Sequence, residues 1–491
     1  MLPWKTIIQI QEDSELPLYL QIANGIIKAI KSGVVKPGAR MPGTRELSRL
    51  LQIHRKTVVN VYWELDAQGW INAVSSKGTF VSDTLPEISP RKLPAKEKTA
   101  ANPDLPGYLF QPDKNIRETV RPFREITGFH DGPDVRLVPV EQLARAYRSV
   151  LSRKSGLLHL SYVDHRGKQQ LRKILSDHLN DSRGMHTTEE NIFISRGSQM
   201  GIYMTIRILV SKGNSVIVGD TNHYYTDSTF LHAGAKLLRA RVDDFGIDVD
   251  EIEKLCRRRK IRAVYVTSHH HYPTTVTLSA ARRMKLLALA EKFGFIIFED
   301  DYDYDFHYQS SPILPLASAD RHGMVVYLGT LSKTLAPSIR IGYVAAPKAL
   351  ISELAKLRQL IDVQGDPFLE QAVAELFALG EIRRHMKKVL KEYRLRRDFM
   401  CEMLKGKLSD VIDFKIPEGG LAIWAKYDKK IPLPALSDKL KKKGVILSNG
   451  LINDVDGKKL NSTRMGFGWM NLKEAEKAVG ILEETVREML R

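Results

Sequence analysis

The apolar positions of the first 82 residues are spaced as in helices and then alternate as in strands. One stripe recurs every four residues and consists of Leu18, Ile22, Ile26 and Ile30, which places it on one helix face. Two more apolar stretches, between Thr44 and Leu51 and between His54 and Gly69, predict a second and a third helix. Alternation over 70–81 predicts a short hairpin. This order predicts a mainly α winged helix-turn-helix domain.

The pattern changes twice further along the chain. Residues 83–119 are rich in Pro, Lys, Glu and Ala, and they predict an extended linker because prolines prevent helix and little apolar surface is available for packing. Over 120–491, strand-like apolar runs alternate with amphipathic helical stretches. That alternation predicts an α/β domain with a central, mostly parallel sheet.

Charge and composition narrow the class of protein. The formal net charge is +18 and the pI is about 9.6, which favours a polyanionic partner, with nucleic acid as the first candidate. The two cysteines are far apart, which argues against a disulfide framework and fits a reducing compartment. The first residues lack the pattern of a signal peptide, and no uncharged apolar run reaches about 18 residues. We therefore expect a cytoplasmic protein without a membrane partner.

Polar residues fall where a winged helix-turn-helix domain contacts double-stranded DNA. The N-terminal turn of the third helix reaches base edges, the start of the second helix reaches phosphate, and the wing tip suits a groove or phosphate contact. The residues at these places are Arg45, His54, Arg55, Lys56, Thr57, Lys77 and Gly78. The alternative interpretation is a solvated basic face on a small helical domain. The placement of these residues favours an operator-binding domain.

This segment resembles the GntR family of regulators. The matching motifs, in order, are Pro17-Leu18-Tyr19, Lys36-Pro37-Gly38, Arg40-Met41-Pro42, Arg45-Glu46-Leu47, Arg55-Lys56-Thr57-Val58, Tyr62-Trp63-Glu64-Leu65, Gly69-Trp70 and Gly78-Thr79-Phe80-Val81. The resemblance implies DNA contacts from Arg45, His54, Arg55, Lys56, Thr57 and Gly78. His54 stands where the family usually has a small or polar residue, so the base preference there is open.

The second region carries the residue types that pyridoxal phosphate chemistry needs, several of them just after predicted strands. Lys333 follows the strand at 325–328 and offers an amine for a Schiff base. Asp300 follows an apolar strand and is the candidate for the pyridine nitrogen, with Tyr302 for the ring phenol oxygen. Arg464 offers a bidentate clamp for an effector carboxylate. Open α/β sheets place ligands at such strand ends.

A phosphate cup and a stacking residue complete the candidate cofactor site. The cup comprises Gly197, Ser198, Gln199, Thr330 and Arg340, which supply a small-residue loop at a helix N-terminus, a hydroxyl and a cation. Tyr224 is favoured as the residue that stacks on the cofactor, with His223 as the alternative. Each element alone is also common outside cofactor sites, but their order and their shared position at strand ends favour a cofactor site.

The second region resembles the MocR subfamily of GntR regulators. The motifs that carry this resemblance are Asp300-Asp301-Tyr302-Asp303, Gly329-Thr330-Leu331-Ser332-Lys333, Arg340-Ile341-Gly342-Tyr343 and Gly197-Ser198-Gln199. The resemblance implies a type I aminotransferase-like fold, pyridoxal 5′-phosphate on Lys333, a small amine or amino-acid effector, and a homodimer with swapped DNA-binding heads. The chain departs from the subfamily at His271 and Thr275, where a glutamine and a glycine are usual, so a different effector pocket is expected.

Three alternatives remain open from the sequence. The chain could be a working aminotransferase that also binds DNA, or a DNA-binding protein whose second domain is only structural. The run His269-His270-His271 invites a metal site. Adjacent residues on an extended segment point to opposite sides, however, and no acidic or cysteine ligand stands at metal spacing. We expect no metal there.

Overall fold

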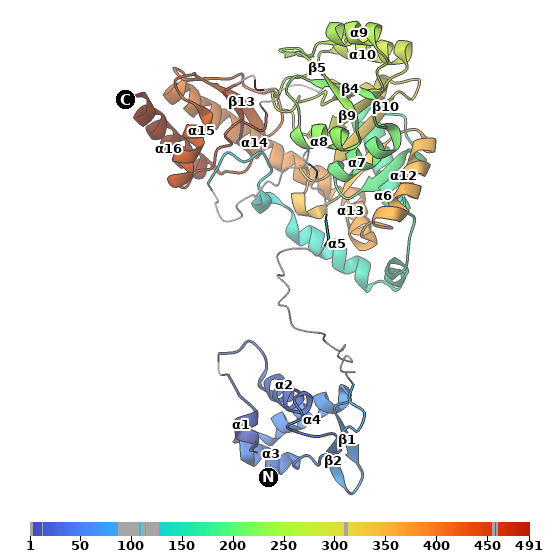
Figure 1. The fold of residues 1–491 in the computed structure, drawn as a ribbon, viewed down its shortest axis with the longest axis vertical. Helices are drawn as coiled ribbons and strands as arrows, with labels where there is room; N and C mark the ends of the chain where they lie inside the picture. The colour runs from blue at the N-terminus through green and yellow to red at the C-terminus, as the bar shows by residue number, and fades with distance from the viewer. Residues whose placement is uncertain are drawn as a thin grey trace. The chain divides into compact units, whose positions relative to one another are not determined.

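The computed structural model describes residues 3–11, 13–86, 108–109, 113, 127–308, 313–453, 457 and 460–491. The chain divides into two compact units, Met1–Phe110 and Gln111–Arg491 (Figure 1). Most of the predicted linker, 83–119, lies outside the described residues. No helix in the part of the chain that the structure describes is long and apolar enough to cross a membrane.

The first unit has the predicted winged helix-turn-helix order. Its elements are α1 (Trp4–Ile7), α2 (Leu18–Lys31), α3 (Thr44–Leu51), α4 (Arg55–Ala67), β1 (Ile71–Val74) and β2 (Gly78–Val81). The two strands pair antiparallel, with Ile71 opposite Val81. The predicted apolar stripe packs inward: Ile22 and Ile26 of α2 are fully buried, as are Leu47 and Val58. Apolar burial between the helices, rather than helix propensity, therefore accounts for most of the stability of so small a unit.

The second unit is built on a seven-stranded sheet with the order β3-β11-β10-β9-β8-β4-β5. These strands are β3 (Ile192–Ser195), β4 (Ser215–Gly219), β5 (Lys236–Ala240), β8 (Ala263–Val266), β9 (Ile296–Asp301), β10 (Val325–Thr330) and β11 (Gly342–Ala345). Five neighbouring strands pair parallel, and β11 runs antiparallel to β10 and β3. The expected mostly parallel sheet is confirmed.

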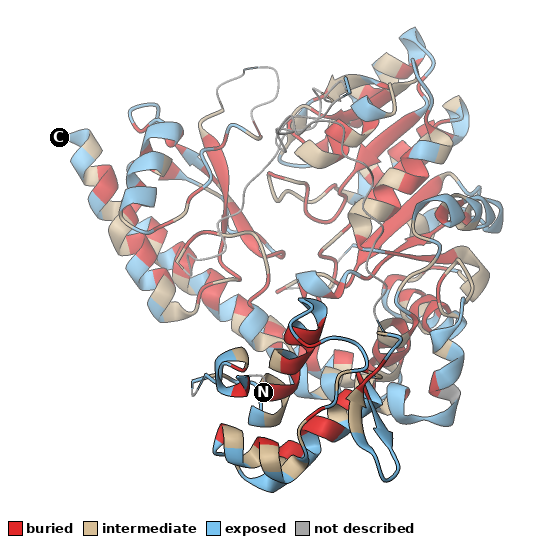
Figure 2. Cartoon of the chain, turned by 60° about the horizontal axis from the view of Figure 1, so that its bottom comes forward, coloured by how far each residue is buried: buried red, intermediate tan, exposed pale blue. Residues whose placement is uncertain are grey.

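Helices cover both faces of this sheet, because successive strand residues point to opposite sides. In β3, Ile192 and Ile194 join a core that includes Leu171 of α6 (Gln169–Arg183), whereas Phe193 joins the core of Met204 in α7 (Ser198–Leu209). Figure 2 shows the strands buried between the helices. Strands buried on both faces are mostly apolar, as the sequence runs indicated, although β9 ends in the buried carboxylates of Glu299, Asp300 and Asp301. 

The other elements flank this sheet or follow it. The helices are α5 (Val140–Ser152), α8 (Tyr224–His232), α9 (Val249–Arg258), α10 (Ala280–Phe293), α11 (Leu316–Ala319), α12 (Lys348–Ile361) and α13 (Pro367–Ala378). The short 3-10 turns are η1 (Val135–Leu137), η2 (Lys154–Leu160), η3 (Glu189–Asn191) and η4 (Pro337–Ile339), and β6 (Val242–Asp243) pairs with β7 (Gly246–Ile247).

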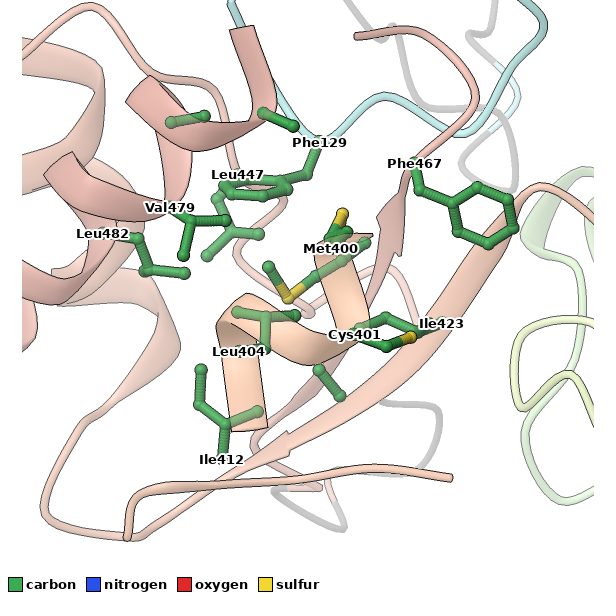
Figure 3. Close-up of a cluster of buried hydrophobic side chains, with 14 of the residues drawn as sticks. Phe129, Met400, Cys401, Leu404, Ile412, Ile423, Leu447, Phe467, Val479 and Leu482 are labelled. Atoms are coloured by element: carbon green, nitrogen blue, oxygen red, sulfur yellow. The ribbon is translucent and has the colours of Figure 1, made fainter. Parts of the chain in front are cut away.

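The C-terminal part forms a smaller layer with its own core. Its sheet is antiparallel and consists of β12 (Ile412–Asp413), β13 (Ala422–Tyr427) and β14 (Ser462–Gly466). Three helices pack with this sheet, namely the 28-residue α14 (Glu381–Leu408), α15 (Leu433–Lys442) and α16 (Leu472–Leu490). Figure 3 shows Met400 and Leu404 of α14 among these side chains, with Phe129 beside Leu447. The segment around Phe129 thus belongs to a core built from residues far along the chain.

Candidate functional site

The predicted cofactor residues gather at one edge of the seven-stranded sheet. Asp300 lies in β9, and Lys333 follows the end of the neighbouring β10. Gly197 follows β3, which runs in the same direction as β10 because both are antiparallel to β11. The carboxyl ends of these strands therefore meet on the side where open α/β folds hold ligands.

Lys333 is held by the segment that precedes the first helix of this unit. Its Nζ donates a hydrogen bond to the backbone carbonyl of Asp131 at 2.9 Å and lies 3.8 Å from the Asp131 carboxylate. The lysine side chain is only 19% exposed. The amine is therefore oriented and largely shielded from solvent.

Asp300 is a buried carboxylate with one oxygen satisfied. Its Oδ2 accepts a 2.6 Å hydrogen bond from the Tyr265 hydroxyl. Its Oδ1 is buried and finds no hydrogen-bond partner within the described residues. Burial raises the pKa of Asp300 to about 7. An orphaned acceptor of this kind fits a protonated ring nitrogen, which would supply both a donor and a positive charge. The site thus fits the pyridine end of pyridoxal phosphate.

The predicted phosphate cup lies at the N-terminus of α7. Gly197 is the N-cap, with a φ of 78°, and a Cβ there would approach the Arg340 guanidinium to 2.5 Å. Arg340 donates to the Arg196 carbonyl at 2.9 Å. Only glycine therefore allows the guanidinium so close to the first turn of a helix, where amide groups are available to an anion.

The remaining cup residues form local contacts. Ser198 is the first residue of α7, and Gln199 donates from Nε2 to the Thr229 hydroxyl at 3.1 Å. The Thr330 hydroxyl donates to Ser332 Oγ at 3.0 Å. The structure thus places the loop, the hydroxyl and the cation of the predicted cup around the ends of β3 and β10.

Aromatic rings line the same region. The His223 and Tyr272 rings meet edge to face, with centroids 4.9 Å apart, and Tyr272 lies 6.3 Å from Tyr302. The Tyr302 hydroxyl donates to the His270 carbonyl at 3.0 Å. The Tyr224 ring meets the Tyr225 ring edge to face, with centroids 5.4 Å apart. These contacts connect His223 to Tyr302 through Tyr272, and both Tyr224 and His223 stay candidates for stacking on a cofactor.

Arg464, the predicted carboxylate clamp, already binds a carboxylate of the chain. From β14, its Nε donates to Asp131 Oδ2 at 2.8 Å and its NH2 group donates to Oδ1 at 3.2 Å. A third donor reaches the Pro273 carbonyl at 3.2 Å, and the guanidinium lies over the Tyr272 ring, 4.7 Å from its centroid. Although burial opposes ionisation, Arg464 and Lys333 hold the pKa of Asp131 well below its usual range.

The three consecutive histidines point to different partners. His269 Nδ1 lies 3.2 Å from Asp301, and His270 Nδ1 lies 2.8 Å from Asp303. His271 pairs with the Thr274 hydroxyl at 3.1 Å, and burial lowers its pKa to about 4. In the described ranges no group of three His, Cys, Asp or Glu side chains could hold a metal ion. His269 and His270 therefore pair with carboxylates at the end of β9 and just after it, whereas His271 contacts its own loop.

The predicted DNA-contacting residues lie on the outside of the first unit. Those exposed are Arg45 on α3, His54, Arg55 and Lys56 at the start of α4, and Lys77 and Gly78 at the wing, while Thr57 is half-buried. His54 also caps α4, since its Nδ1 accepts a 3.3 Å hydrogen bond from the Lys56 amide. Gly78 has a φ of 113°, which a residue with a side chain rarely adopts.

Three residues of this site had no role assigned from the sequence, namely Asp131, Tyr265 and Tyr272. Asp131 lies within residues 128–133, a stretch that fits the resemblance to the MocR subfamily, but its contacts with Lys333 and Arg464 appear only in the structure. Tyr265 lies in the buried strand β8, among apolar residues that suggest only a place in the core. Tyr272 follows the histidine run. The alternation of β8 was a signal for Tyr265, because it sets this residue and its neighbours on opposite faces.

Comparisons with known proteins agree with both units. The family "Aminotransferase class I and II" matches residues 134–482, and "Bacterial regulatory proteins, gntR family" matches residues 18–81. The HTH-type transcriptional regulator YisV of Bacillus subtilis is 27% identical over 97% of both chains. The probable rhizopine catabolism regulatory protein MocR of Rhizobium meliloti is 25% identical over 86% of this chain and 84% of its own.

A solved structure resembles the second unit. The multiple substrate aminotransferase from Thermococcus profundus is 27% identical, with a TM-score of 0.70, over 75% of this chain and 93% of that one. The resemblance to MocR-type GntR regulators, stated from the motifs, is thus confirmed over nearly the whole chain. The chain belongs to the aminotransferase class I and II family, and it joins to that domain a helix-turn-helix domain of the bacterial gntR family.

Proposed function

We propose that this chain is a cytoplasmic DNA-binding transcription regulator whose aminotransferase-like domain holds pyridoxal 5′-phosphate on Lys333. It senses a small amine or amino acid, or the cofactor itself. The observation that carries the proposal is the orphaned Oδ1 of buried Asp300, at the sheet edge that also holds Lys333. The exposed Arg55 and Lys56 at the start of α4 favour DNA as the partner of the other unit.

Each residue has a part in holding the cofactor. When bound, pyridoxal phosphate supplies an electrophilic carbon for an amine and a ring that withdraws electrons. Lys333 provides the anchoring amine, and Asp300 keeps a proton on the ring nitrogen. Tyr302 would hold the ring phenol oxygen, and Tyr224, with His223 as the alternative, would stack on the ring. The phosphate is held by Gly197, Ser198, Gln199, Thr330 and Arg340 through helix-terminal amides, hydroxyl groups and a cation.

The protein acts as a homodimer, with each DNA-binding head crossing to the partner subunit as in the subfamily it resembles. One apolar patch supports this. It consists of side chains that are more than two-thirds exposed, namely Leu157, Leu158, Leu160, Tyr162 and Leu360. Hydrogen bonds of 2.7 Å from the Val163 amide to Gln364 and between His165 and the Val363 carbonyl connect its two segments. A contiguous exposed patch of this kind marks an interface.

A second candidate is an active aminotransferase with a DNA-binding head. The observation that favours it is the retention of Lys333, Asp300 and Arg464 together in a chain similar to an aminotransferase of known structure. The two proposals differ in what happens after the amine reacts. A regulator changes its DNA binding, because the effector binds two arrangements unequally, whereas an enzyme turns over.

The test uses the full-length protein prepared with pyridoxal phosphate. DNA bound from a random-sequence library identifies an operator, and titration with amines then measures the change in DNA affinity. We expect visible absorbance from the bound cofactor and an amine-dependent change in DNA affinity, both lost in Lys333→Ala and kept in Lys348→Ala. Robust turnover with an amino donor and a 2-oxo acid, together with no sequence-specific DNA binding, would overturn the regulator.

A further inference from the structure

Arg464 and Asp131 form a two-point ion pair inside the candidate effector site. Both bonds of the guanidinium fork, at 2.8 and 3.2 Å, run to the two oxygens of one carboxylate. The Arg464 side chain is only 4% exposed. The geometry is that of a guanidinium binding a ligand carboxylate, with the carboxylate supplied by the chain itself.

The backbone around Asp131 is fixed in place by contacts on both sides. Phe129 donates its amide to the Ile446 carbonyl at 2.9 Å and accepts from the Gly466 amide at 3.1 Å. A Cβ on Gly466 would fall 1.8 Å from the His130 carbonyl oxygen, and one on Gly468 would fall 2.7 Å from the Gly132 carbonyl oxygen. Because these glycines allow the segment to lie directly on β14 and the turn after it, Asp131 is built into the site.

Asp131 also presents two kinds of oxygen to an amine. Its carbonyl accepts from Lys333 Nζ at 2.9 Å, and its carboxylate lies 3.8 Å from the same nitrogen. An ammonium group of a ligand that enters beside Lys333 meets the same acceptors. A ligand carboxylate, in contrast, has to displace the Asp131 carboxylate from its two-point pair with the buried Arg464 guanidinium, and breaking such a pair is unfavourable.

We propose that Asp131 determines the specificity of this site by occupying Arg464, and that the ligand is a small primary amine without a carboxylate beside its amino group. This inference rests on the proposed function and narrows its effector class. Arg239, another guanidinium in this unit, does not offer an alternative clamp, since it pairs with Asp227 at 2.6 Å. His271 is also uncharged near neutral pH, because burial lowers its pKa to about 4.

The test compares amines with the corresponding amino acids on the pyridoxal phosphate-loaded protein. The probes are phenethylamine against phenylalanine and ethylamine against alanine, with dissociation constants from calorimetry and from the change in visible absorbance. In the wild-type protein we expect each amine to bind at least about tenfold more tightly than its amino acid. Tighter binding of the amino acids would overturn the inference, and this comparison requires no variant.

Asp131→Asn gives the second arm, because it keeps the shape and removes the charge that neutralises Arg464. We expect the preference for amines to fall by about tenfold or to reverse. The matched control is Asp134→Asn, three residues along, whose carboxylate pairs with Arg396 at 2.9 Å; it should keep the wild-type preference. An unchanged preference in Asp131→Asn contradicts the inference. Failure of the wild-type protein to take up pyridoxal phosphate instead overturns the proposed function.

Discussion

The Tyr265 hydroxyl donates a 2.6 Å hydrogen bond to Asp300 from the neighbouring strand of the sheet. The bond favours the charged form of a carboxylate whose pKa burial raises to about 7. It leaves the other oxygen, Oδ1, for a different donor. Tyr265 therefore positions the carboxylate that we assign to the cofactor ring and favours its charged form.

Tyr265→Phe should weaken the binding of pyridoxal phosphate by about tenfold or more, because a hydrogen bond to a charged group contributes about 1.5–3 kcal/mol. Titration of the cofactor-free protein, followed by visible absorbance, measures the affinity. Tyr304→Phe is the control, since that hydroxyl donates to the Ser182 carbonyl at 3.1 Å and its loss should leave the affinity unchanged. Equal affinities in the wild-type protein and in Tyr265→Phe would remove Tyr265 from the site.

Asp300 should make the cofactor-free protein less stable as the pH rises. Its pKa is about 7 when folded, against 3.8 for the ordinary carboxyl, so the folded state binds the extra proton between these values. Raising the pH from 5 to 8 should therefore destabilise the wild-type protein, relative to Asp300→Asn, by about 2–3 kcal/mol. Urea unfolding at both pH values measures this difference, and bound cofactor should abolish it. A difference that does not change with pH would contradict the assignment.

Thr275 should be a site of backbone strain. It has a φ of 65°, which is costly for a β-branched residue. The subfamily that the chain resembles usually has glycine at this position. Thr275→Gly should stabilise the protein by about 0.5–1 kcal/mol, after subtraction of the entropy that glycine loses on folding. Urea unfolding measures the change. Thr274→Gly is the control and should destabilise, since its hydroxyl pairs with His271 at 3.1 Å.

Arg55 should contribute to the recognition of a specific operator. Arg55→Ala should weaken binding to that sequence by about 1–3 kcal/mol and relax the base preference. Arg45→Ala should instead weaken binding to all sequences and reduce the salt dependence by about one phosphate contact. Fluorescence anisotropy at several salt concentrations distinguishes these outcomes. Arg257→Ala, which removes an exposed charge on α9 of the other unit, should leave both quantities unchanged.

The exposed apolar patch should mediate dimerisation. The double variant Leu158→Asp and Leu160→Asp places two charges among side chains that are 73% and 71% exposed, so it should disrupt association without disturbing a core. Analytical ultracentrifugation should detect a monomer. Leu490→Asp, at the end of α16 and 39% exposed, is the control and should remain dimeric. A double variant that stays dimeric would locate the interface elsewhere.

Local patterns in the sequence determined the order of elements and much of the candidate site. The four-residue spacing that includes Ile22 and Ile26 defines a helix face, and the apolar runs before Asp300 and Lys333 define buried strands. Because parallel strands end at the same edge, the sequence alone also indicated that these two residues lie near each other.

Only the tertiary structure decided what surrounds them. Asp131 contacts Lys333 across 202 positions and Arg464 across 333, and Phe129 enters a core formed by the C-terminal helices. Such contacts depend on how separate elements pack, and no spacing along the chain encodes them. The sequence therefore determined that an arginine is available for a carboxylate. The packing of residues 128–132 against β14 decided that a carboxylate of the chain itself holds it.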